Sequence, residues 1–272
     1  MMIRLEQLSN MANKLIFQVA VGAKSKLYEH CIDSVAAYAK KHDIDHIVLR
    51  QPKLRIGVDP FNTNRSKEAV ARLGYLPIFE KENAFEYLDS YDQVAIIDSD
   101  IYIRDNAPDI FNEMTDEYDF GAVVERQMPI TEAYKVKIRN YTRMQYSSLT
   151  QQDWKWNEDG AEFYNMGMMV LNKGFKKHLK GQTPKEFLNR LEFKDFVDGV
   201  GPWKWSTDQT LLNYFIKKYN IPTKQLSFKW NSLYTAVTPE KQKESHFIHF
   251  FLKDHLPNKG ENVDQLMKDI SL

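Results

Sequence analysis

The residues with the clearest chemical potential are Asp98, Ser99 and Asp100, which directly follow the apolar run Gln93 to Ile97. Ligands of open α/β sheets bind beyond the carboxyl ends of the strands, and this acidic pair ends such a strand. A spacing of two points both carboxylates to one side of an extended segment. Two carboxylates so close repel unless a cation lies between them, and hard oxygen ligands suit Mg²⁺ or Mn²⁺. The pair therefore indicates a divalent metal site, with a solvated turn as the alternative.

The segments around this pair alternate between strand and helix patterns. Two short apolar runs indicate buried strands, Lys14 to Val21 and His46 to Leu49. Between them, apolar residues recur at helical spacing from Ser25, a residue type that is favoured at helix N-caps. Further helical segments are predicted over Lys67 to Leu73 and Phe79 to Leu88. This order of strands and helices predicts an α/β fold with a parallel sheet that is covered by helices.

The second half of the chain has a more mixed pattern. Strands are predicted over Tyr118 to Val124, Met166 to Leu171 and His246 to Phe251. Thr183 and Glu186 match a capping box with proline at the first helical position, and Ser206 with Gln209 matches a second capping pattern. No repeat and no low-complexity linker divides the chain. We therefore expect one domain over residues 14–255, an extension over 1–13, and a tail over 256–272 that forms a short helix packed on the domain.

The composition excludes several classes of protein. The chain has 272 residues, and its 37 Lys and Arg balance 37 Asp and Glu, so a uniformly basic nucleic-acid-binding surface is excluded. The single cysteine, Cys31, cannot form an internal disulfide. No apolar run is long enough to span a bilayer, and the first ten residues lack the apolar core of a signal peptide. We expect a cytoplasmic protein with no transmembrane segment and no nucleic-acid partner.

Five segments carry short motifs in a fixed order that covers roughly residues 14 to 255. They are YDQVAIIDSDIYIRDNAPDIF (Tyr91 to Phe111), FYNMGMMVLNKG (Phe163 to Gly174), STDQTLLNYF (Ser206 to Phe215), LSFKWNSLY (Leu226 to Tyr234), and HFIHFF (His246 to Phe251) followed by Lys253. This order resembles that of the metal-dependent glycosyltransferases of the GT-A fold, which include glycogenin and bacterial lipopolysaccharide galactosyltransferases. The resemblance implies a single Rossmann-like domain with a mostly parallel central sheet flanked by helices.

The resemblance also implies a reaction and a metal. The enzyme would transfer a sugar from a nucleotide-linked donor, UDP-linked in our expectation, to a glycan, lipid or protein acceptor, with retention of configuration. Asp98 and Asp100 would hold the cation with His249 as third ligand, and a nitrogen ligand favours Mn²⁺ over Mg²⁺. The cation would act as a Lewis acid for the departing nucleoside diphosphate. His246 lies three residues before His249, so in a strand its side chain would point to the opposite face.

Further roles follow from the matched motifs. Asp208, Gln209 and Asn165 would be the catalytic residues that line the donor sugar and the reacting face. The nucleotide-sugar would be bound by Ala20, Val21, Gly22, Lys24, Lys81, Asp98, Ser99, Gly167 and Lys253. The chain departs from the usual last motif of the family, Lys-Pro-Trp, because Lys253 is followed by Asp254 and His255. Either Lys253 or Lys259 would therefore contact the diphosphate of the donor.

Each of these residues also has a structural interpretation. The helix dipole would stabilise the carboxylate of Asp208 in the first turn of its helix, and Gln209 would close a capping box. Asn165 and Gly167 would mark a β-bulge. Lys81 would be a solvated charge on a helix face. The sequence alone leaves these alternatives open.

Two other functional classes compete with the transferase. A catalytically inactive nucleotide-sugar-binding module would carry the same motifs. A haloacid-dehalogenase-like phosphatase would also have an acidic pair after a strand, but it needs threonine or valine where Tyr102 stands and a later acidic motif that is absent. Two Trp-Lys-Trp triplets, Trp154 to Trp156 and Trp203 to Trp205, would either stack an acceptor sugar or pack in the core.

Overall fold

The computed structural model describes residues 12–22, 24–68 and 74–271. Its strands are β1 (Lys14–Val19), β2 (Asp45–Leu49), β3 (Gln93–Ile97), β4 (Ile101–Ile103), β5 (Phe120–Val124), β6 (Tyr164–Asn172), β7 (Thr223–Leu226), β8 (Ser232–Leu233) and β9 (Phe247–His249). Six of them form a central sheet in the order β2-β1-β3-β6-β5-β7, and the other three form a small sheet in the order β4-β9-β8.

Helices connect and cover these strands. The α-helices are α2 (Lys26–Lys41), α4 (Glu132–Tyr146), α5 (Lys176–Leu179), α6 (Pro184–Leu188), α7 (Lys194–Asp198), α8 (Asp208–Lys218), α9 (Pro239–Gln242) and α10 (Val263–Ile270). The 3-10 helices are η1 (Pro77–Asp89), η2 (Ile110–Glu113), η3 (Glu125–Gln127), η4 (Lys173–Phe175), η5 (Leu191–Phe193), η6 (Gly201–Trp205), η7 (Phe228–Trp230), η8 (Lys253–His255) and η9 (Pro257–Gly260).

The central sheet is mostly parallel. Strand β1 pairs in parallel with β2 and β3, and β5 pairs in parallel with β7. Strand β6 is antiparallel to both of its neighbours, β3 and β5. The carboxyl ends of β1, β3 and β5 therefore share one edge of the sheet with the amino end of β6. Residues that follow β3 and β5, and residues that begin β6, are brought together at this edge.

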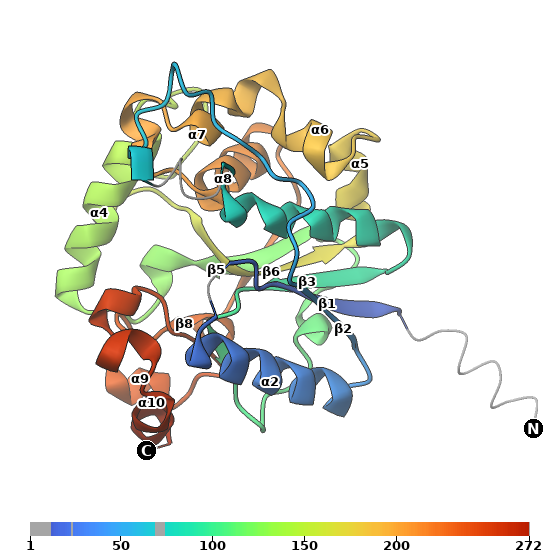
Figure 1. The fold of residues 1–272 in the computed structure, drawn as a ribbon, viewed down its shortest axis with the longest axis vertical. Coiled ribbons are helices and arrows are strands. Elements are labelled where there is room, and N and C mark those ends of the chain that lie inside the picture. Colours follow the sequence, from blue (N-terminus) through green and yellow to red (C-terminus); the bar gives the residue numbers. More distant parts are fainter. Residues whose placement is uncertain (1–11, 23, 69–73, 272) are drawn as a thin grey trace, which may run out of the picture.

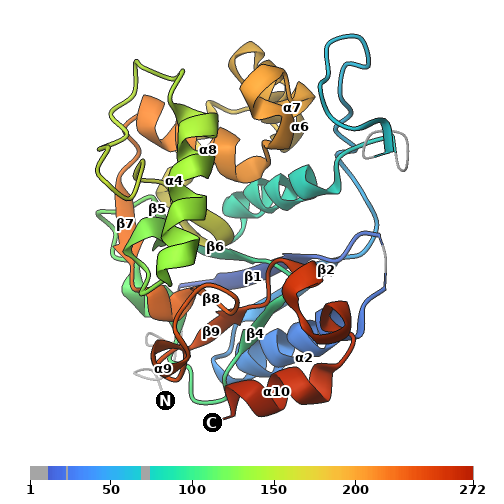
Figure 2. The same cartoon turned by 90° about the vertical axis from the view of Figure 1, so that its left-hand side faces the viewer.

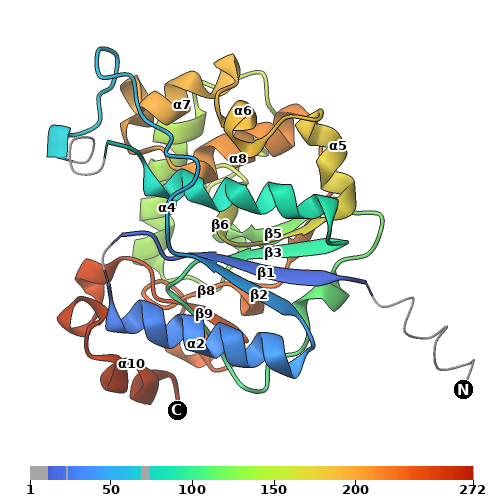
Figure 3. The ribbon, with the colours of Figure 1, turned by 45° about the vertical axis from the view of Figure 1, so that its right-hand side comes forward.

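The sheet lies between two layers of helices, with α2 and α10 on one side and η1, α8 and the short helices α5 to α7 on the other (Figures 1 and 3). Side chains alternate between the layers, as the period of two in a strand requires. In β3, Val94 and Ile96 join the core beneath η1 and α8, whereas Ala95 and Ile97 join the core on the α2 side. Both faces are buried, which explains why the strand sequence is apolar throughout rather than alternating.

The small sheet joins the C-terminal region to the centre of the molecule. Leu266 of α10 packs with Leu27 and Cys31 of α2 and with Ile248 of β9, and Figure 2 shows α10 lying alongside α2. Strand β9 is antiparallel to β4 and places His249 opposite Ile101. Because β4 begins directly after the acidic pair, this pairing carries His249 to the carboxyl edge of the central sheet.

The predicted α/β fold with a mostly parallel sheet flanked by helices is confirmed. The strand predicted over Gln93 to Ile97 has those bounds, and the capping box of Thr183 and Glu186 forms with both of its hydrogen bonds. The second capping pattern was wrong. The N-cap of α8 is Thr207 rather than Ser206, because the Thr207 hydroxyl accepts the hydrogen bond from the Gln209 backbone N–H.

Other predicted elements differ in extent or fall where no structure is described. The late strand is shorter than predicted, Phe247–His249, because the chain leaves the small sheet at Phe250. Most of the helix predicted over Lys67 to Leu73, and residues 1–11 of the predicted extension, lie outside the described residues. Among the helices of the described residues, none has the length and apolarity that crossing a membrane requires.

Candidate active site

The acidic pair forms a turn between β3 and β4 that backbone hydrogen bonds fix in place. The Asp98 N–H donates to the Gly167 carbonyl at 2.7 Å, and the Phe250 N–H donates to the Asp100 carbonyl at 2.9 Å. The turn is thereby tied to β6 on one side and to the end of β9 on the other. Ser99 is half-buried between the two aspartates. The position of both carboxylates is therefore set by two strands that are distant in the sequence.

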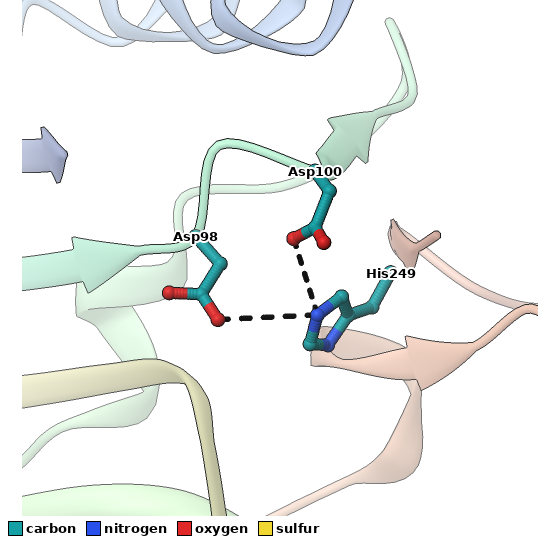
Figure 4. A group of neighbouring side chains, drawn as sticks. All are labelled: Asp98, Asp100 and His249. Carbon is teal, nitrogen blue, oxygen red and sulfur yellow. Dashed lines mark ion pairs between the residues drawn. The ribbon is translucent and has the colours of Figure 1, made fainter. Parts of the chain in front are cut away.

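Asp98, Asp100 and His249 converge on one point, as Figure 4 shows. The His249 Nε2 atom lies 3.2 Å from Asp100 Oδ1 and 3.9 Å from Asp98 Oδ2. One candidate ligand atom from each of the three residues lies within 4.8 Å of the other two. Asp100 Oδ1 is buried, and besides its contact with His249 it accepts no hydrogen bond within the described residues. Two carboxylates, one of them with this buried oxygen, and an imidazole form a donor set that fits a divalent cation such as Mn²⁺.

A chain of hydrogen bonds orients the imidazole of His249. The His249 Nδ1 atom lies 3.0 Å from the Asn231 side-chain oxygen, and the Asn231 amide donates to Asn165 at 2.8 Å. The Asn165 amide donates in turn to Glu125 at 2.9 Å, and the Tyr134 hydroxyl donates to the same carboxylate at 2.7 Å. Because Nδ1 faces a carbonyl oxygen, a neutral imidazole with its proton on Nδ1 would direct the lone pair of Nε2 toward the aspartates. Such partners orient the ligands of metal sites.

Gly167 makes room for His249. The register of β6 against β5 shifts between Met169 and Asn165, so the glycine lies in an irregularity of the strand. A Cβ atom on Gly167 would lie 2.7 Å from His249 Nδ1, closer still to Cε1 of the same ring, and 3.0 Å from Asn165 Oδ1. The irregularity that sequence reasoning offered as an alternative to function is therefore real, and it is also the surface against which the histidine packs.

We expect Gly167→Ala to displace the His249 ring. Overpacking of this kind typically costs about 1–3 kcal/mol of stability. Loss of support for a candidate metal ligand should lower Mn²⁺ affinity by about tenfold or more. Thermal unfolding and Mn²⁺ titration check both effects. Gly57→Ala is the matched control, because a Cβ there would meet only ordinary contacts. Equal behaviour of the two variants would contradict the assigned packing.

Lys81 is buried between two carboxylates. Its ammonium lies 2.7 Å from Asp98 Oδ1 and 2.9 Å from Asp208 Oδ2, and it donates to the Met166 carbonyl at 3.1 Å. Only 7% of the side chain is exposed. Burial works to lower the pKa of Lys81, but the carboxylates of Asp208 and Asp98 outweigh it and raise the pKa. The lysine is thus a fixed cation within the site and not a solvated charge on a helix face.

The pKa values of Asp98 and His249 indicate that the acidic groups of the site lack enough nearby positive charge. The pKa of Asp98 is raised to about 6. Burial is the largest cause, the charge of Lys81 offsets it only in part, and repulsion from Asp100 adds to it. Burial works to lower the pKa of His249, but Asp100 and then Asp98 outweigh it and raise the pKa above the usual value. A bound dication would favour the ionised aspartate and the neutral imidazole instead. The electrostatics therefore agree with the donor set.

A cavity of about 500 Å³ opens onto these groups. Besides Asp98, Asp100, His249 and Lys81, its lining includes the three predicted catalytic residues Asp208, Gln209 and Asn165 together with Gly167. The Gln209 side-chain oxygen accepts a hydrogen bond from the Met166 N–H at 3.2 Å. It does not close a capping box. A larger hollow of about 1040 Å³ lies at the opposite edge of the sheet, beside the start of β1 and β3, far from these groups.

Several predicted donor-binding residues lie outside this cavity. Ala20, Val21 and Gly22 follow β1 at the carboxyl edge of the sheet, and Lys24 borders a separate surface hollow beside α2. Lys253 lies with its ammonium 3.7 Å from the centre of the Tyr28 ring.

The two candidate lysines for the diphosphate differ in their surroundings. Burial, and then the charges of Asp100 and Asp98, raise the pKa of Tyr28, and the Lys253 ammonium lies against the ring of this tyrosine. Lys259 is 77% exposed and pairs with Asp254.

Sequence reasoning missed four residues of the site. Glu125, Tyr134 and Asn231 complete the network behind His249, and the Tyr28 ring contacts the ammonium of Lys253. Two of them had a usable signal. Glu125 directly follows a predicted strand, as Asp98 does, and Asn231 lies within the LSFKWNSLY motif. The other two are contributed by helix faces, where tyrosine carries no such signal.

Comparison with known proteins supports the fold. Neither the family models nor the curated proteins include a match to the sequence. Among solved structures, the chain is similar to the galactosyltransferase LgtC in complex with donor and acceptor sugar analogues (TM-score 0.53, 14% identity, covering 94% of this chain and 95% of that chain). A second LgtC structure, in which an active-site glutamine is replaced by glutamate, matches at a TM-score of 0.50 and 15% identity, covering 94% and 95%.

A third similar structure is apo xyloside xylosyltransferase 1 from mouse (TM-score 0.50, 10% identity, covering 90% of this chain and all of that chain). Identities this low establish the fold and nothing finer. The chain therefore has the fold of the GT-A glycosyltransferases, as the order of its motifs implied.

Proposed function

We propose that the chain is a metal-dependent glycosyltransferase that takes its sugar from a nucleotide-linked donor, with UDP as the nucleotide. The observation that carries the proposal is the convergence of Asp98, Asp100 and His249 in a cavity that also holds the buried pair of Lys81 and Asp208. A diphosphate is anionic, and three carboxylates would repel it. A cation between the acidic pair and the diphosphate resolves that repulsion.

The similar structures support the same activity. LgtC is a galactosyltransferase whose structure contains donor and acceptor sugar analogues, and the mouse enzyme transfers xylose according to its name. An active-site glutamine is known in LgtC, and in this chain Gln209 lines the cavity beside Asp208. Two different sugars among proteins of one fold leave the donor sugar open. We therefore propose the reaction class and the nucleotide, and not the sugar.

The transfer exchanges one bond for another at the anomeric carbon of the donor. An acceptor hydroxyl oxygen bonds to this carbon while the bond from the carbon to the diphosphate oxygen breaks. The diphosphate leaves with the bonding electron pair and takes up the hydroxyl proton. When both events occur on the same face, the configuration is retained. A bound divalent cation would stabilise the charge that develops on the leaving diphosphate.

The chain's own residues hold the reacting groups in place. Lys81 pins the Asp208 carboxylate at the first residue of α8, where it lines the cavity. Gln209 is fixed by the Met166 N–H and lies beside Tyr141, whose pKa burial raises to about 12. Both side chains are therefore ordered before a donor binds, which lowers the entropy cost of orienting it. Lys253, beside Tyr28, is the lysine that we assign to the diphosphate.

Calorimetric titration of UDP tests the proposal. We expect UDP to bind in the presence of Mn²⁺ and not in excess chelator, and slow hydrolysis of UDP-sugars to follow the same dependence. Binding that is unaffected by the chelator would contradict the metal site, and no UDP binding under any condition would contradict the function. Tight Mn²⁺-dependent binding without turnover of any UDP-sugar would identify an inactive binding module instead.

The two histidines of the β9 region provide a second test. His249 faces the aspartates, whereas His246 packs its ring on Trp230, 4.9 Å between centroids. We expect His249→Ala to weaken Mn²⁺-dependent UDP binding by about tenfold or more, since one lost ligand removes at least about 1.4 kcal/mol. His246→Ala, the matched control, should leave this affinity unchanged. Equal losses in calorimetry would mean that the metal ligand is wrongly assigned.

The pH dependence of the wild type follows from the same site. Metal binding needs neutral His249 and ionised Asp98, and both pKa values are raised in the free protein, that of Asp98 to about 6. Protonation of either group competes with the cation. The Mn²⁺-dependent UDP affinity should therefore fall as the pH drops from 8 toward 6.

A further inference from the structure

Trp205 is an exposed aromatic residue inside the candidate active-site cavity. It ends η6, 60% of its surface is exposed, and it lines the cavity with Asp208 and Gln209. Two of the other three tryptophans of the Trp-Lys-Trp triplets have structural roles. Trp154 is buried and stacks on Tyr146 at 4.2 Å, and the Trp203 indole N–H donates to the Gln145 carbonyl at 2.9 Å. No aromatic ring of the described residues packs on Trp205, and the Lys204 ammonium lies 5.0 Å from the centroid of its ring.

The cavity has a charged part and an apolar part. The charged part holds the candidate metal ligands and the pair of Lys81 and Asp208, which the proposed donor site uses. The rest of the lining is mostly apolar or aromatic, with Lys137 as an exposed cation, and includes Trp205, Leu252, Phe251, Tyr134, Ile138 and Tyr141.

Two of these apolar side chains are exposed to solvent. Trp205 is 60% exposed and Leu252 is 43% exposed. Single exposed apolar residues are ordinary on protein surfaces. Two that line one cavity of ligand size indicate a binding surface for an uncharged, partly apolar group.

We propose that the acceptor is a saccharide and that one of its rings stacks on the indole of Trp205. This inference rests on the proposed function. A sugar ring presents C–H groups on its faces and hydroxyls around its rim, so an aromatic face buries its apolar side while the rim stays free. Tryptophan provides this contact area with little loss of side-chain entropy. A lipid tail would need an apolar lining throughout, which the charged part of the cavity does not offer.

The position of Trp205 places such a ring beside the reacting groups. Trp205 lies three residues before Asp208, the first residue of α8, and four before Gln209. The candidate nucleotide contacts Ala20 to Gly22 follow β1 and do not line this cavity. The donor nucleotide and the acceptor would therefore approach the acidic pair from different sides. A rim hydroxyl of the stacked sugar would then face the anomeric carbon of the donor.

The test uses the full chain with Mn²⁺ and the UDP-sugar that it hydrolyses, and a panel of p-nitrophenyl glycosides of common hexoses and pentoses as acceptor probes. We expect at least one glycoside to stimulate UDP release above donor hydrolysis. Trp205→Ala should raise the KM for that glycoside about tenfold or more, which is about 1.4 kcal/mol of binding energy. The kcat and the calorimetric UDP affinity should change little. Trp205→Phe should retain most of the affinity, because a ring face remains.

Trp156→Ala is the matched control. Trp156 belongs to the other triplet and is 45% exposed, but it does not line the cavity. We expect its KM to equal that of the wild type. With UDP binding intact, an unchanged KM in Trp205→Ala would overturn the inference, and so would stimulation by a tyrosine-containing peptide and by no glycoside. Failure of the wild type to bind UDP would refute the proposed function itself, which calorimetry detects separately.

Discussion

Asp100→Asn is expected to abolish metal-dependent nucleotide binding while leaving the fold intact. The change removes one of the two carboxylates from the cluster and keeps the size of the side chain. We expect the UDP affinity in the presence of Mn²⁺ to fall about 100-fold or more, because a lost anionic ligand removes both a bond and a charge, on the order of 3 kcal/mol. Titration of UDP at fixed Mn²⁺ measures this loss.

The stability of this variant should be unchanged or slightly higher. An asparagine side-chain oxygen can keep the 3.2 Å contact that Asp100 Oδ1 makes with His249 Nε2. The negative charge of Asp100 also helps to raise the pKa of Asp98, and its removal relieves that repulsion. Asp105→Asn is the matched control, since Asp105 is exposed on the same segment and belongs to no candidate ligand group. Asp100→Asn with the UDP affinity of this control would move the metal site elsewhere.

Lys81→Met is expected to be strongly destabilising. The lysine is the buried cation between Asp98 and Asp208, and methionine fills a similar volume without the charge. Breaking a buried ion pair by removing one partner typically costs about 3–5 kcal/mol, because the other charges remain buried without compensation. Chemical denaturation at pH 8 measures the change. Lys173→Met is the control, because its pair with Asp92 is exposed and should contribute about 0.5 kcal/mol or less.

The pH dependence of this loss has a definite sign. Asp98 already has a pKa raised to about 6 by burial, and removing Lys81, which lowers it, should raise it further. A carboxyl whose pKa is higher in the folded state binds protons more tightly there, so stability increases as the pH falls through that pKa. The difference between Lys81→Met and the wild type should therefore shrink from pH 8 to pH 5. A difference that is constant with pH would mean that lost packing, and not unpaired charge, causes it.

The sequence alone determined the local features of the site. The run Gln93 to Ile97 is apolar throughout, which predicts a strand buried on both faces, and an acidic pair directly after such a strand must lie at the edge of the sheet. The spacing of three between His246 and His249 likewise predicts that their rings point in opposite directions, and the two rings do face different surroundings. These inferences succeeded because each depends only on neighbouring residues and on backbone geometry.

Only the tertiary structure decided which distant residues meet at this edge. Lys81 is an ordinary charge in the sequence, and its burial depends on η1 packing against both the acidic turn and the start of α8. Gly167 meets His249 because the irregularity in β6 lies beside β9, and Asn231 meets the same ring from a third segment. Contacts between residues so far apart leave no period in the sequence, because they arise from how whole elements pack. The antiparallel insertion of β6 between β3 and β5 is what brings these segments to one cavity.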